Sequence, residues 1–315
     1  MDRYKLVVLC LSIVLAISIL GCADGGVSIT NHGNSATGKP PSDYIRDSTP
    51  VVLPTEALGI HTIANEKAIL DYSKTDSGYI CAKSLIAPTL VKVLVKFSGV
   101  QYQYALRDSN DYVTIPLSEG NGNYDVSFWE NLYDDSYAAI FSQNLDVTLS
   151  DPFLPFLHPN QFVNYRSSDR AVALSQELTA NNNGIVNTIS DIYLYIIKNI
   201  KYDFEKAASV ASYYIPVIDE TLETKKGICF DYAVLTASML RAQRIPSKLV
   251  IGYAGSAYHA WIEVYSSEEG WIKKIYFDGE NYVLMDPTFA SAGGGQVDIT
   301  SIIGDGENYN PRFYY

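Results

Sequence analysis

Three residues in the C-terminal half of the chain have the side chains of a cysteine-dependent acyl-transfer site. They are Cys229, His259 and Asp286, and they occur in that order along the sequence. A thiolate attacks acyl carbons, an imidazole can take up the thiol proton, and a carboxylate can hold that imidazole in one tautomer. Each residue type also has ordinary structural uses, so the surrounding segments must be considered as well.

Cys229 lies in the segment KKGICFDYAVL, at the point where apolar residues begin to follow a helical spacing. Gly227 allows the chain to turn sharply into that helix. Unpaired N–H groups at a helix N-terminus favour a thiolate and could also bind an oxyanion, the N–H of Cys229 in particular. The alternatives are a buried cysteine acting as a small hydrophobic residue and a disulfide with Cys81.

His259 lies in the segment AYHAWIEVY, whose two-residue period predicts a strand with His259 and Trp261 on one face. Asp286 ends the predicted strand in YVLMDPTF, since Pro287 stops further strand pairing. A buried structural histidine and a turn-capping aspartate are the alternatives for these two residues. His158 precedes a proline, which favours extended backbone, and we expect it to be a structural histidine in a connector.

The spacing of apolar residues around these three positions predicts an α+β fold. Helical spacing precedes strand-like spacing in this half of the chain, which is typical of helices packed on an antiparallel sheet. The predicted helices cover residues 167–180, 184–200, 216–226 and 229–245, and the predicted strands cover 247–255, 257–266, 270–279 and 281–289.

An earlier region has the pattern of a small β-sandwich. Five runs between residues 89 and 149 alternate apolar and polar residues or are rich in β-branched and aromatic residues, and turn-forming clusters separate them. We therefore predict a β-sandwich-like domain over residues 51–150 and a second domain over residues 151–315, with the boundary at a segment rich in proline. The sandwich contains no pattern that specifies a ligand.

The N-terminus resembles a bacterial lipoprotein signal peptide. Arg3 and Lys5 precede an apolar run that ends in ILGC, which is similar to a lipobox. This resemblance implies a signal peptide over residues 1–21 and a lipid attached to Cys22, and it predicts an extracytoplasmic protein anchored to the membrane. Residues 22–50 are rich in Gly, Ser, Asn and Pro and are predicted to form a flexible tether. An uncleaved signal anchor is the alternative.

The charge of the chain restricts its partners. Lys and Arg number 23 against 35 Asp and Glu, so the formal net charge is −12 and the pI is about 4.7. Nucleic acids and anionic lipid surfaces attract clustered basic residues. The composition therefore argues against a nucleic-acid partner and against electrostatic adhesion to lipid.

The segments GICFDYAVLTASMLRAQRIPSKLVIGYAG, YHAWIEVY and MDPTF resemble the transglutaminase-like superfamily of cysteine enzymes. The similarity covers a Gly-x-Cys-x-Asp start, a helix ending in LR-x-x-x-IP, a GY pair, an HAW-x-EV strand and a DPT. It implies a papain-like core, with Cys229 as nucleophile, His259 as general base and acid, and Asp286 as the residue that orients His259. It also implies that Asp231 and Tyr232 support the helix start and that Trp261 shapes the acyl channel or the core.

The resemblance implies no metal and no cofactor, and it does not identify a second oxyanion donor. It implies a protein or a cell-wall peptide as substrate, with a thioester intermediate resolved by water or by an amine. The alternative from another class is an inert lipoprotein that binds a saccharide or a protein at the cell surface. An intact set of Cys, His and Asp favours the enzyme.

Overall fold

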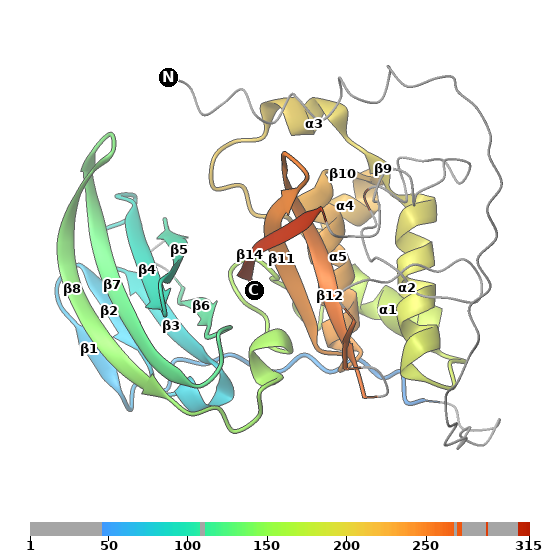
Figure 1. Ribbon diagram of the computed structural model, residues 1–315, viewed down its shortest axis with the longest axis horizontal. Helices are drawn as coiled ribbons and strands as arrows, with labels where there is room; N and C mark the ends of the chain where they lie inside the picture. The colour runs from blue at the N-terminus through green and yellow to red at the C-terminus, as the bar shows by residue number, and fades with distance from the viewer. Residues whose placement is uncertain (1–45, 108–110, 268–269, 273–287, 289–307) are drawn as a thin grey trace, which may run out of the picture.

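The computed structural model describes residues 46–107, 111–267, 270–272, 288 and 308–315. Its elements form a β-sandwich followed by a helical layer packed on a second antiparallel sheet (Figure 1). The predicted α+β class is therefore confirmed. Among the described residues, no helix combines the length and the apolar character needed to cross a membrane.

The sandwich consists of two four-stranded antiparallel sheets. One sheet has the order β1-β2-β3-β6 and the other has the order β5-β4-β7-β8. The strands are β1 (Thr62–Ala64), β2 (Ala68–Asp71), β3 (Tyr79–Ser84), β4 (Val91–Phe97), β5 (Val100–Leu106), β6 (Val113–Pro116), β7 (Gly122–Tyr133) and β8 (Ser136–Val147), with a 3-10 turn, η3, at Thr75–Ser77. All eight strands lie within the range predicted for this domain, and β1, β2 and β3 precede the five predicted runs.

Apolar side chains alternate inward along these strands and fill the space between the two sheets. In β4, Val91, Val93 and Val95 are fully or almost fully buried, whereas the residues between them are not. Val126 and Phe128 of β7 join the same core. Burial of such a row on one face sets the register, since a slip by one residue would expose it.

The second half is built around one helix that is buried along most of its length. Helix α5 (Cys229–Ala242) packs against β11 and β12 and is surrounded by α1, α2 and α4. The helices are α1 (Arg170–Thr179), α2 (Ile185–Asn199), α3 (Phe204–Ser209) and α4 (Ile218–Thr224). Of these, only α3 is absent from the sequence prediction.

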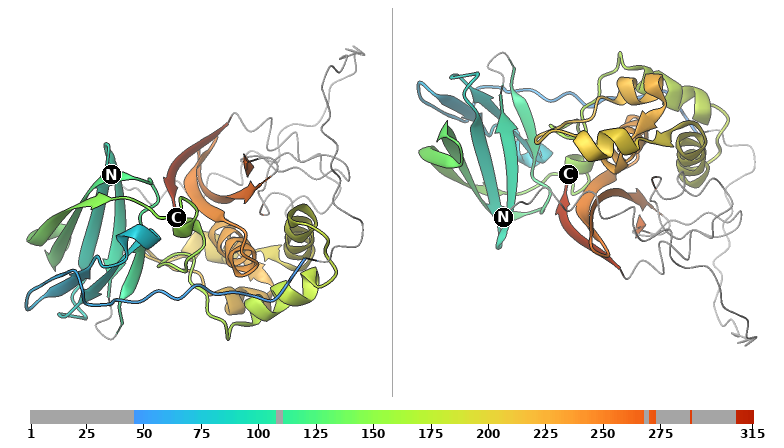
Figure 2. Two further views of the ribbon diagram at one scale, coloured as in Figure 1. Left: turned by 90° about the horizontal axis from the view of Figure 1, so that it is seen from below. Right: turned by 90° about the horizontal axis from the view of Figure 1, so that it is seen from above.

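The second sheet has the order β13-β12-β11-β14 and is antiparallel throughout. Its strands are β11 (Ser247–Ala254), β12 (Ala257–Ser266), β13 (Gly270–Ile272) and β14 (Tyr309–Tyr314), and a short parallel pair joins β9 (Lys201–Tyr202) to β10 (Lys226–Gly227). Of the strand predicted at 281–289, only Thr288 is among the described residues. Strand β14 was not predicted, and it lies between β11 and the sandwich (Figures 1 and 2).

A connector and a buried arginine join the two halves. The connector contains the turn η4 (Leu154–Phe156). Arg241 of α5 is 1% exposed, and its guanidinium donates to the carbonyls of His158 at 2.8 Å, Tyr315 at 2.7 Å and Ser247 at 2.7 Å. One side chain thus binds the connector, the residue that follows β14, and the start of β11.

Residues 46–50, the last part of the predicted tether, lie against the end of α5. The amide of Gln243 donates to the carbonyl of Ser48 at 2.9 Å, and Arg244 donates to the carbonyl of Thr49 at 2.8 Å. The backbone N–H of Val51 donates to the carbonyl of Ala242. These residues are therefore fixed to α5 from both sides, because side chains at the helix end bind their carbonyls and the N–H of Val51 binds a carbonyl that the helix end leaves without an intrahelical donor.

Candidate active site

Cys229 is the first residue of α5, as the sequence predicts. Ile228 before it is extended, with φ −94° and ψ 174°, so the chain enters the helix abruptly. The N–H groups of the first helical turn have no intrahelical acceptor. The thiol therefore lies at the end of α5 where partial positive charge accumulates.

Asp231 fixes the start of this helix. Its carboxylate accepts the backbone N–H of Ile228 at 2.7 Å, which satisfies one of the donors that the helix start leaves over. Lys206 forms an ion pair with the same carboxylate at 2.9 Å, and the hydroxyl of Tyr214 donates to it at 2.5 Å. Burial and this hydrogen bond raise the pKa of Tyr214. Asp231 thus supports the helix start, as predicted.

Gly227 is required for a different reason from the one expected. The sequence prediction relied on the backbone freedom of glycine. In the structure, a Cβ on Gly227 would lie 2.7 Å from the Cβ of Asp231 and 3.2 Å from its Oδ2. The glycine leaves room for the carboxylate to fold back onto the helix start.

His259 lies in the central part of the second sheet. It is on β12, opposite Gly252 of β11, and is 7% exposed. Its ring stacks on Trp261 with the centroids 6.3 Å apart, and Tyr309 lies at the same distance. A Cβ on Gly252 would lie 2.2 Å from the carbonyl oxygen of Asn310, so only glycine allows β14 to approach here.

Cys229 and His259 line one cavity of about 700 Å³. Tyr258 and Phe230, the neighbours of these two residues in the chain, line it as well. The described lining residues include no Asp, Glu, Lys or Arg; they are Gln101, Gln103, Phe162, Tyr202, Ala207, Val210, Ile228, Cys229, Phe230, Ile251, Tyr258, His259, Ala260, Phe313 and Tyr315. The structure therefore places the predicted nucleophile and the predicted base at the same opening, while Asp286 lies outside the described residues.

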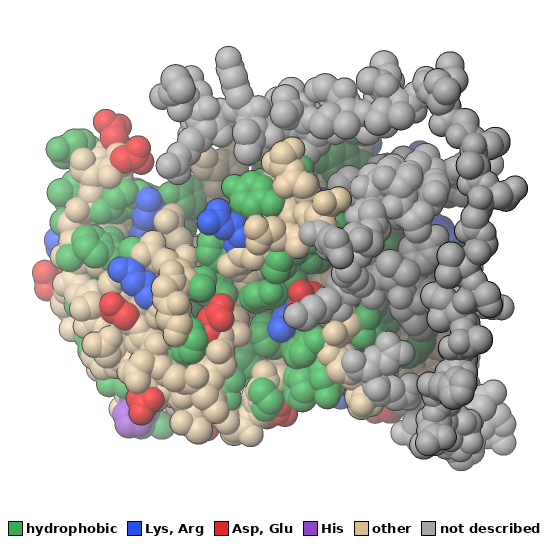
Figure 3. Space-filling model, viewed as in Figure 1, with side chains coloured by type: hydrophobic (Ala, Val, Ile, Leu, Met, Phe, Trp, Pro, Cys, Tyr) green, Lys and Arg blue, Asp and Glu red, His purple; other side chains and the backbone are tan. Residues whose placement is uncertain are grey.

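The sandwich contributes to this cavity, which the sequence did not reveal. Gln101 and Gln103 of β5 line it, more than a hundred residues before Cys229. On the side of the second domain, Phe313 and Tyr315 contact Tyr102 of β5, with centroid distances of 5.4 and 5.5 Å. Figure 3 shows hydrophobic side chains gathered along the middle of one face, between the sandwich and the second half.

Tyr258 is a further residue at the site that sequence reasoning did not single out. It is 52% exposed and lines the cavity next to His259. Partial burial, with smaller contributions from Tyr253 and Cys229, raises its pKa, so the hydroxyl keeps its proton at neutral pH. The only sequence signal was its position in the YHAW segment.

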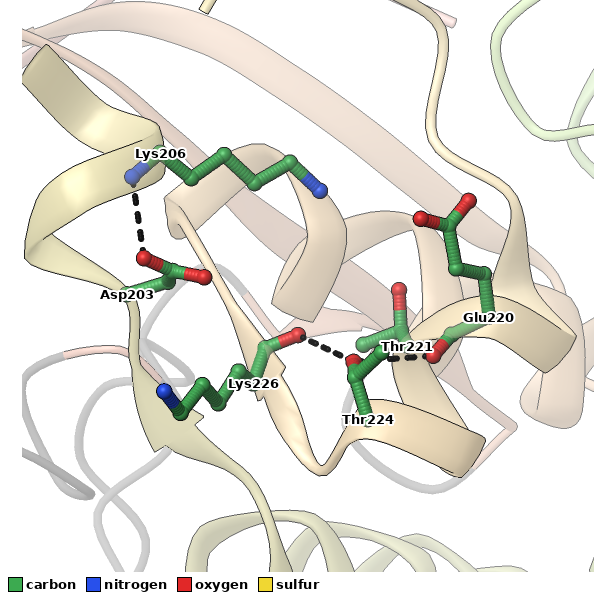
Figure 4. A pocket seen from close by; sticks show the side chains of 6 residues that line it. All are labelled: Asp203, Lys206, Glu220, Thr221, Thr224 and Lys226. Atoms are coloured by element: carbon green, nitrogen blue, oxygen red, sulfur yellow. Dashed lines mark hydrogen bonds between the residues drawn. The ribbon is translucent and has the colours of Figure 1, made fainter. Parts of the chain in front are cut away.

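A second cavity, of about 340 Å³, has a different character. It is lined by Asp203, Lys206, Glu220, Thr221, Thr224 and Lys226 (Figure 4). The backbone N–H of Lys206 donates to Asp203 at 2.9 Å, while its side chain extends away toward Asp231. Neither a cysteine nor a histidine is among its described lining residues, so the larger cavity is the candidate active site.

The two cysteines of the described chain are both free. Cys81 is 3% exposed, and burial raises its pKa to about 12, so it is an inert thiol in the sandwich core. The alternative of a disulfide between Cys81 and Cys229 is therefore wrong. Cys22, the predicted lipid attachment site, lies outside the described residues.

His158 has the structural role expected of it. It is 7% exposed in the connector, and its ring packs on Tyr79 at a centroid distance of 5.0 Å. In the described ranges, no group of three or more His, Cys, Asp or Glu side chains is arranged to hold a metal ion.

Comparisons with known proteins find similarity in part of the second half of the chain. Residues 172–274 match the family model of the transglutaminase-like superfamily, and this range includes Cys229 and His259. The UPF0252 protein MJ1282 of Methanocaldococcus jannaschii is 31% identical over 139 residues, which are 40% of this chain and 37% of that protein. A protein-glutamine gamma-glutamyltransferase of Pseudomonas aeruginosa is 31% identical over 90 residues, 24% of this chain and 12% of that enzyme.

Among solved structures, the periplasmic domain of TgpA from Pseudomonas aeruginosa aligns with 80% of this chain and 78% of its own, with 18% identity and a TM-score of 0.36. The chain spans well under half the length of the two curated relatives. The helix that begins with Cys229 and the strand that carries His259 both fall within the matched segment. Residues 172–274 therefore form a domain of the transglutaminase-like superfamily of cysteine enzymes.

Proposed function

We propose that the protein is a cysteine acyl-transfer enzyme that acts on carboxamide or peptide bonds. The observation that carries this proposal is that Cys229 and His259, from two separate elements, line one cavity, with Cys229 as the first residue of α5. A thiol, an imidazole and a helix N-terminus are the three groups that formation of a thioester requires.

The reaction begins with transfer of the Cys229 thiol proton to His259. The thiolate sulfur forms a bond to the acyl carbon, and the oxyanion that results accepts a hydrogen bond from the N–H of Cys229. His259 then returns its proton to the leaving nitrogen as the C–N bond breaks, which leaves a thioester on Cys229 and releases an amine or ammonia. Asp286 orients the imidazole in this scheme.

Water or an amine completes the cycle. Water attacking the thioester gives a carboxylic acid, whereas an amine gives a new amide and a cross-link. The relative named as a protein-glutamine gamma-glutamyltransferase supports glutamine carboxamide as the acyl donor. A peptide of the cell wall or of a surface protein is the substrate that suits an exported enzyme.

Glutamine-containing peptides and protein substrates test this proposal. Wild-type protein should release ammonia or cleave the peptide, and Cys229→Ser should lose at least about a thousandfold in turnover, because the hydroxyl is a far weaker nucleophile at neutral pH. Cys81→Ser is the matched control and keeps wild-type turnover. Wild-type rates from Cys229→Ser would remove Cys229 from the mechanism. Adding a primary amine separates transfer from hydrolysis, since only transfer incorporates the amine.

We also propose that the enzyme is exported and held at the membrane by a lipid on Cys22. The signal-like segment before Cys22 and its small residues support this location. Expression in a bacterial host followed by mass spectrometry of the N-terminal peptide should reveal a diacylglyceryl mass on Cys22. Cys22→Ser should lack it and leave the membrane fraction. A retained, unmodified N-terminus would favour the signal anchor instead.

A further inference from the structure

Among the described strands, β5 lies at the edge of its sheet and pairs on one side only, with β4. It pairs with β4 through a two-residue turn at Ser98 and Gly99, both of which have positive φ, and the register begins at Phe97 opposite Val100. In such a hairpin the residues flanking the turn exchange hydrogen bonds, and every second residue does so from there on. Tyr102 and Tyr104 therefore bond to β4, whereas Gln101, Gln103 and Ala105 direct their N–H and C=O groups away from it.

One of these three outward positions is already occupied within the protein. The side-chain amide of Gln161 donates to the carbonyl of Ala105 at 2.8 Å, and the N–H of Ala105 donates to the amide oxygen of Gln161 at 3.4 Å. These two hydrogen bonds use the same N–H and C=O groups of Ala105 that an adjacent antiparallel strand would bind. Gln161 thus acts as one residue of an adjoining strand at the end of β5.

The next two outward positions belong to residues at the candidate active site. Gln103 and Gln101 line the cavity that contains Cys229 and His259. In the described part of the chain, β5 pairs with β4 alone, and no backbone hydrogen bond reaches Gln101 or Gln103 from any other segment. The free edge of β5 thus begins beside Gln161 and continues, at about 3.4 Å per residue, along the cavity wall.

The geometry points to an extended polypeptide substrate that adds to β5 as a further strand, with its main chain hydrogen-bonded to Gln103 and Gln101. This inference rests on the proposed function and names its substrate class. An edge strand binds peptides through main-chain bonds and selects alternate side chains through pockets. A saccharide lacks N–H and C=O groups repeated at strand spacing. The described lining has no Asp, Glu, Lys or Arg and includes several aromatic residues, which favours a segment with uncharged side chains around the reacting residue.

Backbone N-methylation of a peptide substrate tests the inference on the wild-type enzyme. Gln103 and Gln101 lie two residues apart, so they should bond to two peptide residues that are separated by one residue. N-methylation of either of these two peptide residues should lower kcat/KM roughly three- to tenfold, the range for one lost main-chain hydrogen bond. Methylation at the position between them should change kcat/KM by less than about twofold. Equal losses at all positions, or no loss at any, would overturn the inference.

A proline on the enzyme provides an independent test. Gln103→Pro removes one outward N–H without removing a bond to β4, which edge strands tolerate. We expect KM for the peptide to rise roughly three- to tenfold with little change in kcat. Ser142→Pro is the matched control, since Ser142 holds an equivalent outward place on β8, the opposite edge of the same sheet. An unchanged KM for a folded Gln103→Pro variant would contradict the inference. If that variant does not fold, the N-methylated peptides with the wild-type enzyme test the inference instead.

The same peptides separate this inference from the proposed function. Turnover without an alternating pattern would leave the acyl-transfer function standing and overturn the strand-addition inference. If no peptide is turned over, binding to Cys229→Ala by fluorescence anisotropy replaces kcat/KM. Binding that alternates with the methyl position supports strand addition even when the proposed chemistry fails, whereas no binding overturns it.

Discussion

A Cβ atom on Gly227 would lie 2.7 Å from the Cβ of Asp231, the residue that anchors the start of the cysteine-bearing helix. Cβ atoms do not approach other carbons so closely, so one of the two residues would have to move. The carboxylate of Asp231 would then lose its bond to Ile228, and the first turn that carries Cys229 would shift.

Gly227→Ala should therefore destabilise the protein by about 1–3 kcal/mol and lower its turnover. Urea denaturation measures the first effect, and steady-state kinetics measures the second. Gly184→Ala is the control, because a Cβ there meets nothing within 4 Å and the residue precedes α2, which contributes no described residue to the cavity lining. Its cost should stay below about 1 kcal/mol. Equal effects from both variants would contradict the role of Gly227.

The two cysteines of the described chain should differ sharply in reactivity. Cys229 lines the cavity, whereas Cys81 is buried and its pKa is raised to about 12. Iodoacetamide at neutral pH should label Cys229 rapidly and leave Cys81 unmodified, as measured by mass spectrometry of the separated peptides. In denaturant both should react. Similar labelling rates in the native protein would contradict this prediction.

His158 should make the folded protein sensitive to mild acid. Burial, with a smaller effect from Arg241, lowers its pKa to about 4 from the ordinary value of 6.5. Between these two values the unfolded chain binds the proton and the folded chain does not. The free energy of unfolding therefore falls as the pH falls from about 6.5 to about 4, by about 2 kcal/mol after allowance for partial solvent access.

His158→Gln should lose this dependence. The free energy of unfolding of wild type and variant is measured at pH 7 and at pH 4.5, and the difference between the two proteins is compared at the two pH values. The contribution of carboxylates that titrate in both proteins cancels in this difference. A difference that does not change with pH would show that His158 is not held neutral by the fold.

Substitution of Arg241 should lower the free energy of unfolding more than substitution at most other positions. Its guanidinium binds carbonyls of the connector, of β11 and of Tyr315, and it is fully buried. Burial lowers its pKa to about 10, which still leaves it charged at neutral pH. Arg241→Lys keeps a positive charge but cannot reach all three carbonyls, and it should cost about 3–5 kcal/mol in thermal or urea unfolding.

Arg244→Lys is the matched control for Arg241. Arg244 lies three residues further on, with a side chain that is 36% exposed and bonded to residues 47 and 49. Its replacement should cost less than about 1 kcal/mol. A similar loss at both positions would mean that the buried guanidinium carries no special stabilisation.

Local patterns along the chain predicted most of the elements that carry the candidate site. Helical spacing placed the start of α5 at Cys229, and the two-residue period placed His259 and Trp261 together on β12, where their rings stack. These predictions succeed because a helix start and a strand face depend on neighbours only a few residues away. The short helix α3 was not predicted, although Asp203 caps its first turn locally. Strand β14 was not predicted because it forms by pairing with β11, which lies far away in the sequence.

The sequence alone determined the chemistry that is available: a thiol at a helix start, an imidazole on a strand and the family to which their segment belongs. Only the tertiary structure decided that Gln101 and Gln103 of the sandwich share the cavity with them, and that Gly252 and Arg241 serve the packing of β14 and its neighbours. The reason is physical: local periodicity records which face of an element is buried, but it does not record which distant element covers that face.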